Sequence, residues 1–462
     1  MRPGAAQSLP AGVRAGFAAA LVAYVASAAW LVWRTSILEP YSDMYDWLAR
    51  WDLFRANGDL WAYLWAPHNF HHLVWTFIVL GLDITAFGAS SYLFLAVGVL
   101  CLAGTAAMLA GAAADAAGPG LRLIGAGVAA ALSLMGAQIL DVSADINTTY
   151  VHALVFAVAA ILLAERPGPW PALRGSGALA CAVAASLGSA AGLAVWPALA
   201  FGAWRAGRRG WLIAVLGVGA AVSALYLLGE GASSRTGAAL GGAGLPEVRR
   251  LIDGVLIFVN YLGLPWARAI PRLGWAIGLA AIGLSLAALV TRRAAQAGWT
   301  AEAARALIVF SLTTAAMAGA ARTGVIAPDL VPMRYAVFLI PLHAGLWMLA
   351  LPHLRKAMEA RPRLFAGAVA AAALALLAHQ AVMGVFAVRT GDANLRLIAD
   401  FRSGQRTAPM LVTIYGDLDR ARAVNARLRR AGLYQRELRR DPPGANGSRP
   451  DGSGTSASSP GR

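Results

Sequence analysis

Long apolar stretches, separated by short polar segments, constrain what this chain can fold into more than any other feature of its sequence. A helix needs about 20 apolar residues to cross the hydrocarbon core of a bilayer, so apolar stretches of about 15 to 25 residues are taken as spans. The sequence contains eleven of them, at 16–33, 90–112, 122–140, 150–164, 176–188, 190–203, 211–228, 275–290, 304–320, 336–351 and 364–387. It therefore predicts an all-α polytopic membrane protein with about 11 transmembrane helices.

Composition agrees with this class. Hydrophobic residues make up 58% of the chain and charged residues 13%, whereas soluble proteins carry about 25% charged residues. The net charge of +16 comes from arginines at span ends and in a polar tail, so we predict no nucleic-acid partner. Cys101 and Cys181 lie inside apolar stretches, without the spacing of a zinc site or a disulfide framework.

The arginine positions predict how the chain crosses the membrane. Short cytoplasmic loops of membrane proteins are rich in arginine and lysine. With the N-terminus inside, the inner loops hold Arg122; Arg166 and Arg174; Arg205, Arg208 and Arg209; Arg292, Arg293 and Arg305; and Arg355, Lys356, Arg361 and Arg363. The first span contains "ASA", which resembles a signal-peptidase site, but the apolar run reaches full span length and predicts an uncleaved helix. The C-terminal tail is then outside.

Two further apolar segments are predicted to lie at, or dip into, the outer interface rather than to cross it. Segment 71–88 carries Asp83, and segment 251–266 is interrupted by Asp253 and Pro265. If both segments crossed, the arginine-rich loops between them would move to the outside, against the charge rule.

The chain divides into three predicted regions. Residues 1–387 form the transmembrane domain, whose first outer loop, 34–89, contains interfacial helices. Residues 388–440 form a small soluble outer-side βα tail, with a strand over 410–415 and an amphipathic helix after it. Residues 441–462 are rich in Pro, Gly and Ser and are predicted to be disordered.

Aromatic residues concentrate in the first outer loop. In "SDMYDWLARWDLF" Trp47 and Trp51 are four residues apart, and Trp61 and Trp65 repeat this spacing in "GDLWAYLWAPH". Tryptophan prefers the headgroup level of a membrane. The pattern predicts short surface helices with an aromatic face at that level.

The same loop holds the candidate chemical groups. Asp43 precedes a predicted helix, where it is either an N-cap or a functional carboxylate. The run "HNFHH" brings His68, Asn69, His71 and His72 to the same interface, for proton transfer or for interfacial anchoring. The run has no HExxH spacing and no clear second acidic ligand, so a divalent metal stays an open alternative without support from the sequence, and no other cofactor is predicted.

Two other outer segments carry polar candidates. Asp145 and Asn147 precede a span, and Arg334 and Tyr335 open another. An arginine at a helix start either snorkels to the interface or holds a phosphate, for which its planar fork is well suited.

This layout resembles the GT-C class of integral-membrane glycosyltransferases. The shared features are an N-terminal span, a large outer loop that opens with an acidic residue ("SD", 42–43), many spans, a late "RY" (334–335) and a soluble outer tail. "PHNFHH" is similar to the H-N-E-H-R run of an uncharacterised bacterial branch, with Phe70 and His72 in place of its acidic residue and arginine. The resemblance extends to about residue 387 and implies location in a bacterial inner membrane.

The resemblance also implies a reaction. The class uses polyprenyl-phosphate sugar donors, and a glycan, a lipid or a protein is the acceptor. Asp43 would be the general base, and direct displacement would invert the anomeric centre. The residues implied in substrate binding are Asp46, His68, Asn69, His71, His72, Asp145, Asn147, Arg334 and Tyr335. Among these, a histidine and Arg334 would neutralise the departing phosphate.

Other functions remain open. A transporter or flippase for a lipid-linked or anionic solute would place ionisable groups near the bilayer midplane. An oligosaccharide polymerase or ligase, an acyltransferase, and a catalytically silent scaffold are further alternatives.

Overall fold

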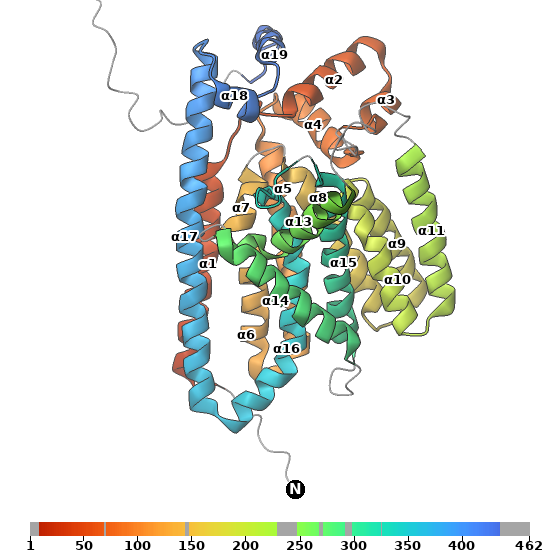
Figure 1. Ribbon diagram of the computed structural model, residues 1–462, viewed down its shortest axis with the longest axis vertical. Coiled ribbons are helices and arrows are strands. Elements are labelled where there is room, and N and C mark those ends of the chain that lie inside the picture. Colours follow the sequence, from red (N-terminus) through yellow and green to blue (C-terminus); the bar gives the residue numbers. More distant parts are fainter. Residues whose placement is uncertain are drawn as a thin grey trace, which may run out of the picture.

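The computed structural model shows a helical bundle with small helices packed on one of its ends (Figure 1). It describes residues 9–68, 71–143, 147–228, 247–267, 271–291, 298–324 and 326–434. Within these ranges no strand is assigned. The α-helices are α1 Ala11–Thr35, α2 Met44–Asn57, α3 Leu60–Trp65, α4 Val74–Phe87, α5 Tyr92–Ala117, α6 Arg122–Ser133, α7 Gly136–Ser143, α8 Thr148–Glu165, α9 Pro171–Ser186, α10 Val195–Arg205, α11 Arg209–Leu228, α13 Glu247–Ala267, α14 Pro271–Val290, α15 Trp299–Arg322, α16 Ile340–Ala360, α17 Pro362–Arg402, α18 Ala408–Thr413 and α19 Leu418–Arg430, and the 3-10 helices are η1 Pro119–Leu121, η3 Ala190–Ala194 and η5 Met333–Leu339.

Eight helices in the described part are long and apolar enough to cross a membrane, so this is a multi-pass membrane protein. They are α1, α5, α8, α11, α14, α15, η5 joined to α16, and α17. The other three predicted spans correspond to shorter helices. Segment 122–140 is divided into α6 and α7, 176–188 falls in α9, and 190–203 comprises η3 and most of α10. The total of eleven crossings therefore stays a prediction.

One end of the bundle, here called the loop end, carries α2, α3, α4, α18 and α19 (Figure 1). The helices predicted in the first loop are present. Their predicted aromatic face at the headgroup level is wrong for α2, because Tyr45, Trp47 and Trp51 are buried in a cluster shared with α4 and the tail. Trp61 on α3 is exposed instead. Burial of these large aromatic side chains stabilises the packing of α2 against α4 and the tail.

Helices α13 and α14 form a tightly packed hairpin. A Cβ atom at Gly263 would lie 1.9 Å from the Gly274 carbonyl oxygen, and one at Gly278 would lie 1.9 Å from that of Val259. Small residues let helix backbones approach closely inside a membrane. Segment 251–266, predicted as an interfacial helix, is thus one arm of this hairpin.

The tail begins inside a helix. The 41-residue α17 runs alongside α1 for the height of the bundle and continues past residue 387, the predicted domain boundary, to Arg402. The predicted strand 410–415 is wrong, because this segment largely forms helix α18. An isolated strand leaves its backbone groups unpaired, and no partner strand exists among the described residues. The predicted amphipathic helix is α19. The disorder predicted for 441–462 falls outside the described residues.

Side chains from the tail dock on the first loop. Arg402 pairs with the buried Glu39 at 2.6 Å, and Arg427 pairs with Asp52 at 3.4 Å. Arg420 lies 3.1 Å from Asp46. Together with the shared apolar cluster, these contacts make the loop end one packed unit.

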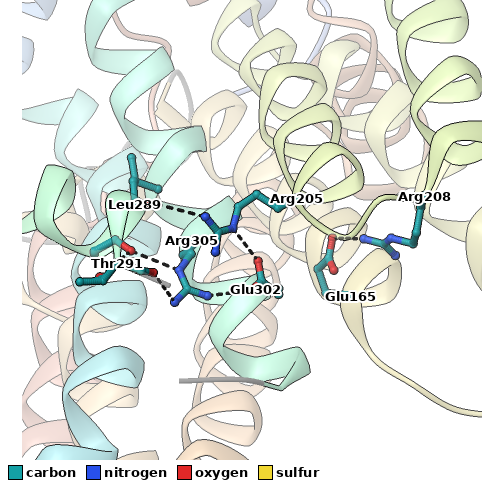
Figure 2. A network of polar contacts seen from close by, with 8 residues as sticks. Glu165, Arg205, Arg208, Leu289, Thr291, Glu302 and Arg305 are labelled. Atoms are coloured by element: carbon teal, nitrogen blue, oxygen red, sulfur yellow. Dashed lines mark hydrogen bonds and ion pairs between the residues drawn. The ribbon is translucent and has the colours of Figure 1, made fainter. Parts of the chain in front are cut away.

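The opposite end carries a network of arginines and glutamates (Figure 2). Arg305, which is 1% exposed, pairs with Glu302 at 2.7 Å and donates to the carbonyl oxygen of Ala288 at the end of α14. Arg205 joins the same Glu302 at 3.1 Å. Arginines that bind the last carbonyl groups of a helix complement its dipole.

Candidate functional site

Two of the candidate histidines, His68 and His71, lie between α3 and α4 and are here called the histidine turn. His68 and His71 exchange two backbone hydrogen bonds, each with an N···O distance of 2.8 Å. The ring of Trp47 packs edge-on against the His68 ring at 5.9 Å. This turn brings both imidazoles next to the start of α2.

Asp43 pairs with His68 instead of capping its helix. The carboxylate oxygen Oδ2 lies 3.2 Å from His68 Nε2, and the Asp43 side chain makes no capping hydrogen bond to α2. Of its side chain, 39% is exposed, whereas the His68 side chain is 8% exposed. The carboxylate therefore reaches solvent while a buried imidazole holds it.

Two arginines from different elements flank Tyr335. The Arg322 guanidinium, at the end of α15, lies 5.7 Å from the centre of the Tyr335 ring, and that of Arg334 lies 5.6 Å from it. Arg322 Nη2 also donates to the Tyr335 hydroxyl at 2.5 Å. Tyr335 is also held by Tyr261, whose hydroxyl donates to the Tyr335 carbonyl oxygen at 3.1 Å.

The histidine turn and the arginine pair share one site. His71 lies within electrostatic reach of Arg322, Arg334, Asp43 and His68. Burial lowers the pKa of His71 to about 3, and the two arginines and His68 act in the same direction, against Asp43. Arg334 is exposed and the Asp43 side chain is partly exposed, so these five side chains, together called the recess here, reach the surface of the protein.

An apolar groove lies beside this recess. Its volume is about 560 Å³, and α13 and α15 form its walls, with Gly254, Phe258, Ala316 and Ala320 among the lining residues. The groove reaches Thr323, the residue that follows Arg322 in the chain. Several apolar side chains of α13 near the groove are exposed, including Leu251 at 70% and Val255 at 51%.

Two of the predicted binding residues have other contacts, and a third, Asn147, lies at the start of α8. Asp46 accepts a hydrogen bond from the Tyr415 hydroxyl and pairs with Arg420, both in the tail. His72 is buried, with its ring nitrogens 2.5 Å and 3.2 Å from the carbonyl oxygens of Trp65 and Tyr226. Asn147 immediately precedes α8, one turn before Tyr150. Asn69 and Asp145 lie outside the described residues.

Sequence reasoning misses three residues of the site. In the sequence, Arg322 stands out only as a charge in an outer loop. Tyr41 lies within electrostatic reach of Arg334 and Asp43, and the Tyr150 ring packs edge-on against Tyr335 at 5.7 Å. The available signal is position, since all three lie in a predicted outer segment or at its edge.

No three His, Cys, Asp or Glu side chains gather closely enough to hold a metal ion within the ranges that the structure covers.

Comparison with known proteins does not identify a family for this chain. No protein-family model matches the chain, and no curated protein or solved structure shows significant similarity to it. The fold and the site together define a multi-pass helical membrane protein with a carboxylate, two imidazoles and two guanidinium groups around one recess.

Proposed function

We propose that the protein is a membrane glycosyltransferase that moves a sugar from a polyprenyl-phosphate donor to a glycan, lipid or protein acceptor. One observation carries the proposal: Asp43, His68, His71, Arg322 and Arg334 share a recess that adjoins an apolar groove. Such a donor has a polar, anionic head and a long apolar chain, and this surface offers a matching pair of environments.

The charges of the recess suit the phosphate. When the bond between the anomeric carbon and the phosphate oxygen breaks, its electron pair stays on the polyprenyl phosphate, which gains negative charge. Arg322 and Arg334 would stabilise this charge, since guanidinium groups bind phosphate oxygens strongly. Positive groups fixed where negative charge develops lower the barrier of a reaction.

Asp43 is the proposed general base. The acceptor hydroxyl would transfer its proton to the carboxylate while its oxygen forms the new bond to the anomeric carbon, inverting that centre. His68 is then a positioning residue, because its Nε2–H holds the carboxylate at 3.2 Å. The exposure of Asp43 supports access by an acceptor.

The groove between α13 and α15 supports a lipid donor. Its lining is apolar apart from Arg250 and Thr323, and exposed apolar residues of α13 surround it. An isoprenoid chain in the groove would keep its phosphate near Arg322. The reaction would then take place at one membrane surface, which we assign to the outer face of a bacterial inner membrane on the charge rule.

A binding and transfer experiment tests the proposal. Purified protein in nanodiscs would be titrated with a 55-carbon polyprenyl monophosphate and examined by native mass spectrometry. Arg334→Gln should weaken binding by about tenfold or more, because hydrogen bonds to charged groups contribute about 1.5–3 kcal/mol. Arg55→Gln, at an exposed arginine of α2, is the matched control.

Asp43→Asn separates binding from catalysis. It should bind the polyprenyl phosphate like the wild type, but transfer of radiolabelled hexose or pentose from polyprenyl-phosphate sugars to membrane acceptors should fall by about 10²- to 10⁴-fold, the usual contribution of a general base. A wild-type protein that does not bind the polyprenyl phosphate would refute the proposal.

Transport is a second candidate, because one half-buried cluster of a tryptophan and two histidines favours it. Trp266 Nε1 donates to His343 Nε2 at 3.1 Å, and His379 Nε2 lies 3.0 Å from the Pro265 carbonyl oxygen. Ionisable residues within membrane helices often mark a transport path. Movement of a fluorescent polyprenyl phosphate across proteoliposomes, lost in His379→Phe and kept in Asp43→Asn, would favour this function over transfer.

A further inference from the structure

His71 differs from the other histidines of the recess in how its ring is held. Its Nδ1 atom accepts a hydrogen bond from the backbone N–H of Ala190 at 3.2 Å. Ala190 begins η3, more than a hundred residues away in the chain, so the contact joins the histidine turn to the α9–α10 connection. Among the described residues, no hydrogen-bond acceptor engages the other ring nitrogen, Nε2.

This contact determines which nitrogen carries the proton. A backbone N–H group can only donate, so Nδ1 must present its lone pair. A ring that accepts at Nδ1 is neutral, and its single proton is on Nε2. His71 is therefore a hydrogen-bond donor at Nε2, directed by the backbone of a separate element.

The surrounding charges favour the same state. Arg322 from α15 and Arg334 from η5 disfavour an imidazolium, as does His68 from the same turn, whereas Asp43 favours one. Burial of the ring adds to the two arginines. The one carboxylate is already paired with His68 at 3.2 Å.

We propose that His71 is a permanently neutral donor whose Nε2–H binds a phosphate oxygen of the ligand held by Arg322 and Arg334, while proton transfer belongs to Asp43, which His68 positions. The identity of the phosphate as the head of a polyprenyl-phosphate donor rests on the proposed function. The protonation state of His71 does not rest on it, because it follows from the bond to Ala190.

A neutral donor in this position discriminates between ligand states. It binds an oxygen of the phosphate without adding a third positive charge beside two guanidinium groups, which would hold the product phosphate too tightly for release. Its hydrogen bond also strengthens as charge develops on that oxygen, so it stabilises the departing phosphate more than the bound donor.

Nuclear magnetic resonance of the 15N-labelled imidazoles tests this directly. The chain has 7 histidines, and loss of one signal in His71→Gln assigns His71. We expect a neutral ring with the proton on Nε2 from pH 8 down to pH 5 in nanodiscs. Protonation of His71 with a midpoint above pH 5, or a proton on Nδ1, overturns the proposal whatever the transferase assay shows.

Two phosphate probes separate this proposal from the proposed function. A shift of the His71 Nε2–H signal on adding polyprenyl monophosphate supports both. A shift with inorganic phosphate alone, when no polyprenyl phosphate binds, supports the donor role and rejects the lipid donor. Absence of any shift when native mass spectrometry shows polyprenyl phosphate bound overturns the donor role.

Substitutions provide an independent arm. In His71→Gln the amide oxygen can accept from Ala190 and the amide N–H can donate to the ligand, but the side chain cannot become charged. We expect it to bind polyprenyl monophosphate within about threefold of wild type, and His71→Leu to bind about tenfold more weakly. Equal losses in both variants would overturn the proposal. His353→Gln, at an exposed histidine of α16, is the control.

Discussion

At the scale of single residues, three histidines of one short run have three different environments. His68 pairs with a carboxylate, His71 accepts from a backbone amide, and His72 lies against two backbone carbonyl groups and the Trp65 ring. The sequence could predict that these side chains lie near a membrane surface. It could not assign their roles, because their partners come from α2, η3 and α11.

The pH dependence of stability should report the environment of His71. Burial lowers the pKa of this group from 6.5 to about 3 in the folded state. Between these values the unfolded chain binds a proton that the folded chain does not, so the free energy of unfolding falls as the pH decreases below about 6.5. Thermal unfolding midpoints (Tm) in detergent should therefore fall less steeply toward acid pH in His71→Gln than in the wild type.

The exposed His353 provides the comparison for this measurement. The His353→Gln variant, measured over the same range from pH 8 to pH 4, gives the effect of removing an exposed imidazole. If His71→Gln follows the wild-type curve, the folded His71 titrates like an ordinary histidine and the stated environment is wrong.

At the scale of helices, glycines set the packing of the α13–α14 hairpin. Gly278→Ala would place a Cβ atom 1.9 Å from the Val259 carbonyl oxygen, whereas a Cβ atom at Gly283 in the same helix meets nothing within 4 Å. We expect Gly278→Ala to destabilise the protein by about 1–3 kcal/mol through overpacking. Gly283→Ala should be neutral or stabilise it by up to about 1 kcal/mol, because alanine favours the helix.

Thermal unfolding of the two variants in the same detergent would measure the difference. Helices of a freely sliding hairpin could shift to accept the added methyl group. Equal stability of the two variants would therefore show that α13 and α14 are not in close backbone contact.

The contacts between the tail and the first loop should differ in strength according to their burial. Glu39 and Arg402 have side chains that are 9% and 19% exposed, whereas those of Asp52 and Arg427 are 42% and 50% exposed. We expect Glu39→Ala to weaken tail docking by about 2 kcal/mol or more, since it leaves a poorly solvated arginine unpaired. Asp52→Ala should cost less than about 1 kcal/mol.

Hydrogen exchange of the α18 and α19 amides measures this docking. The protection of both helices should fall strongly in Glu39→Ala and little in Asp52→Ala. A larger loss in Asp52→Ala would mean that the exposed pair, not the buried one, holds the tail.

The helices themselves are largely predictable, because apolar runs of span length have few alternatives in a membrane. Two details of these helices cannot be predicted from the apolar runs. The run 122–140 reads as continuous, yet the helix is interrupted between Ser133 and Gly136, where Gln380 from α17 accepts a hydrogen bond from the Gly136 amide. The run 410–415 is too short for its pattern to distinguish a strand from a helix, and packing against α2 and α17 decides it.

At the scale of the whole molecule, the charge rule alone assigns both halves of the site to one side of the membrane. It places the loop 34–89 and the segment 321–335 together on the outer side, and the recess is built from these two segments. The rule cannot give the depth of a residue in the membrane or the distance between two residues. The rule also counts Arg322 and Arg334 as positive charges on the side where arginine is normally rare. In the structure both flank Tyr335 and lie within electrostatic reach of His71.

The same rule yields a testable orientation for the entire bundle. Arginines of the predicted inner loops gather at the end opposite the loop end: Arg166 lies 3.9 Å from Asp115, at the far end of α5, and Arg205 joins the network in Figure 2. Retention of positive charge in the cytoplasm should place this end inside and the tail outside. Gln405 and Glu359 are exposed residues just beyond the two ends of α17.

Single cysteines at these positions would decide the orientation. In a background with Cys101→Ala and Cys181→Ala, Gln405→Cys should react with a membrane-impermeant maleimide on intact cells, and Glu359→Cys should react only after the membrane is permeabilised. The reverse pattern would put the recess on the cytoplasmic side, where sugar nucleotides are available and a lipid-linked donor is not required. Reaction of both cysteines on intact cells would mean that α17 does not cross the membrane, which its length and apolar sequence otherwise require.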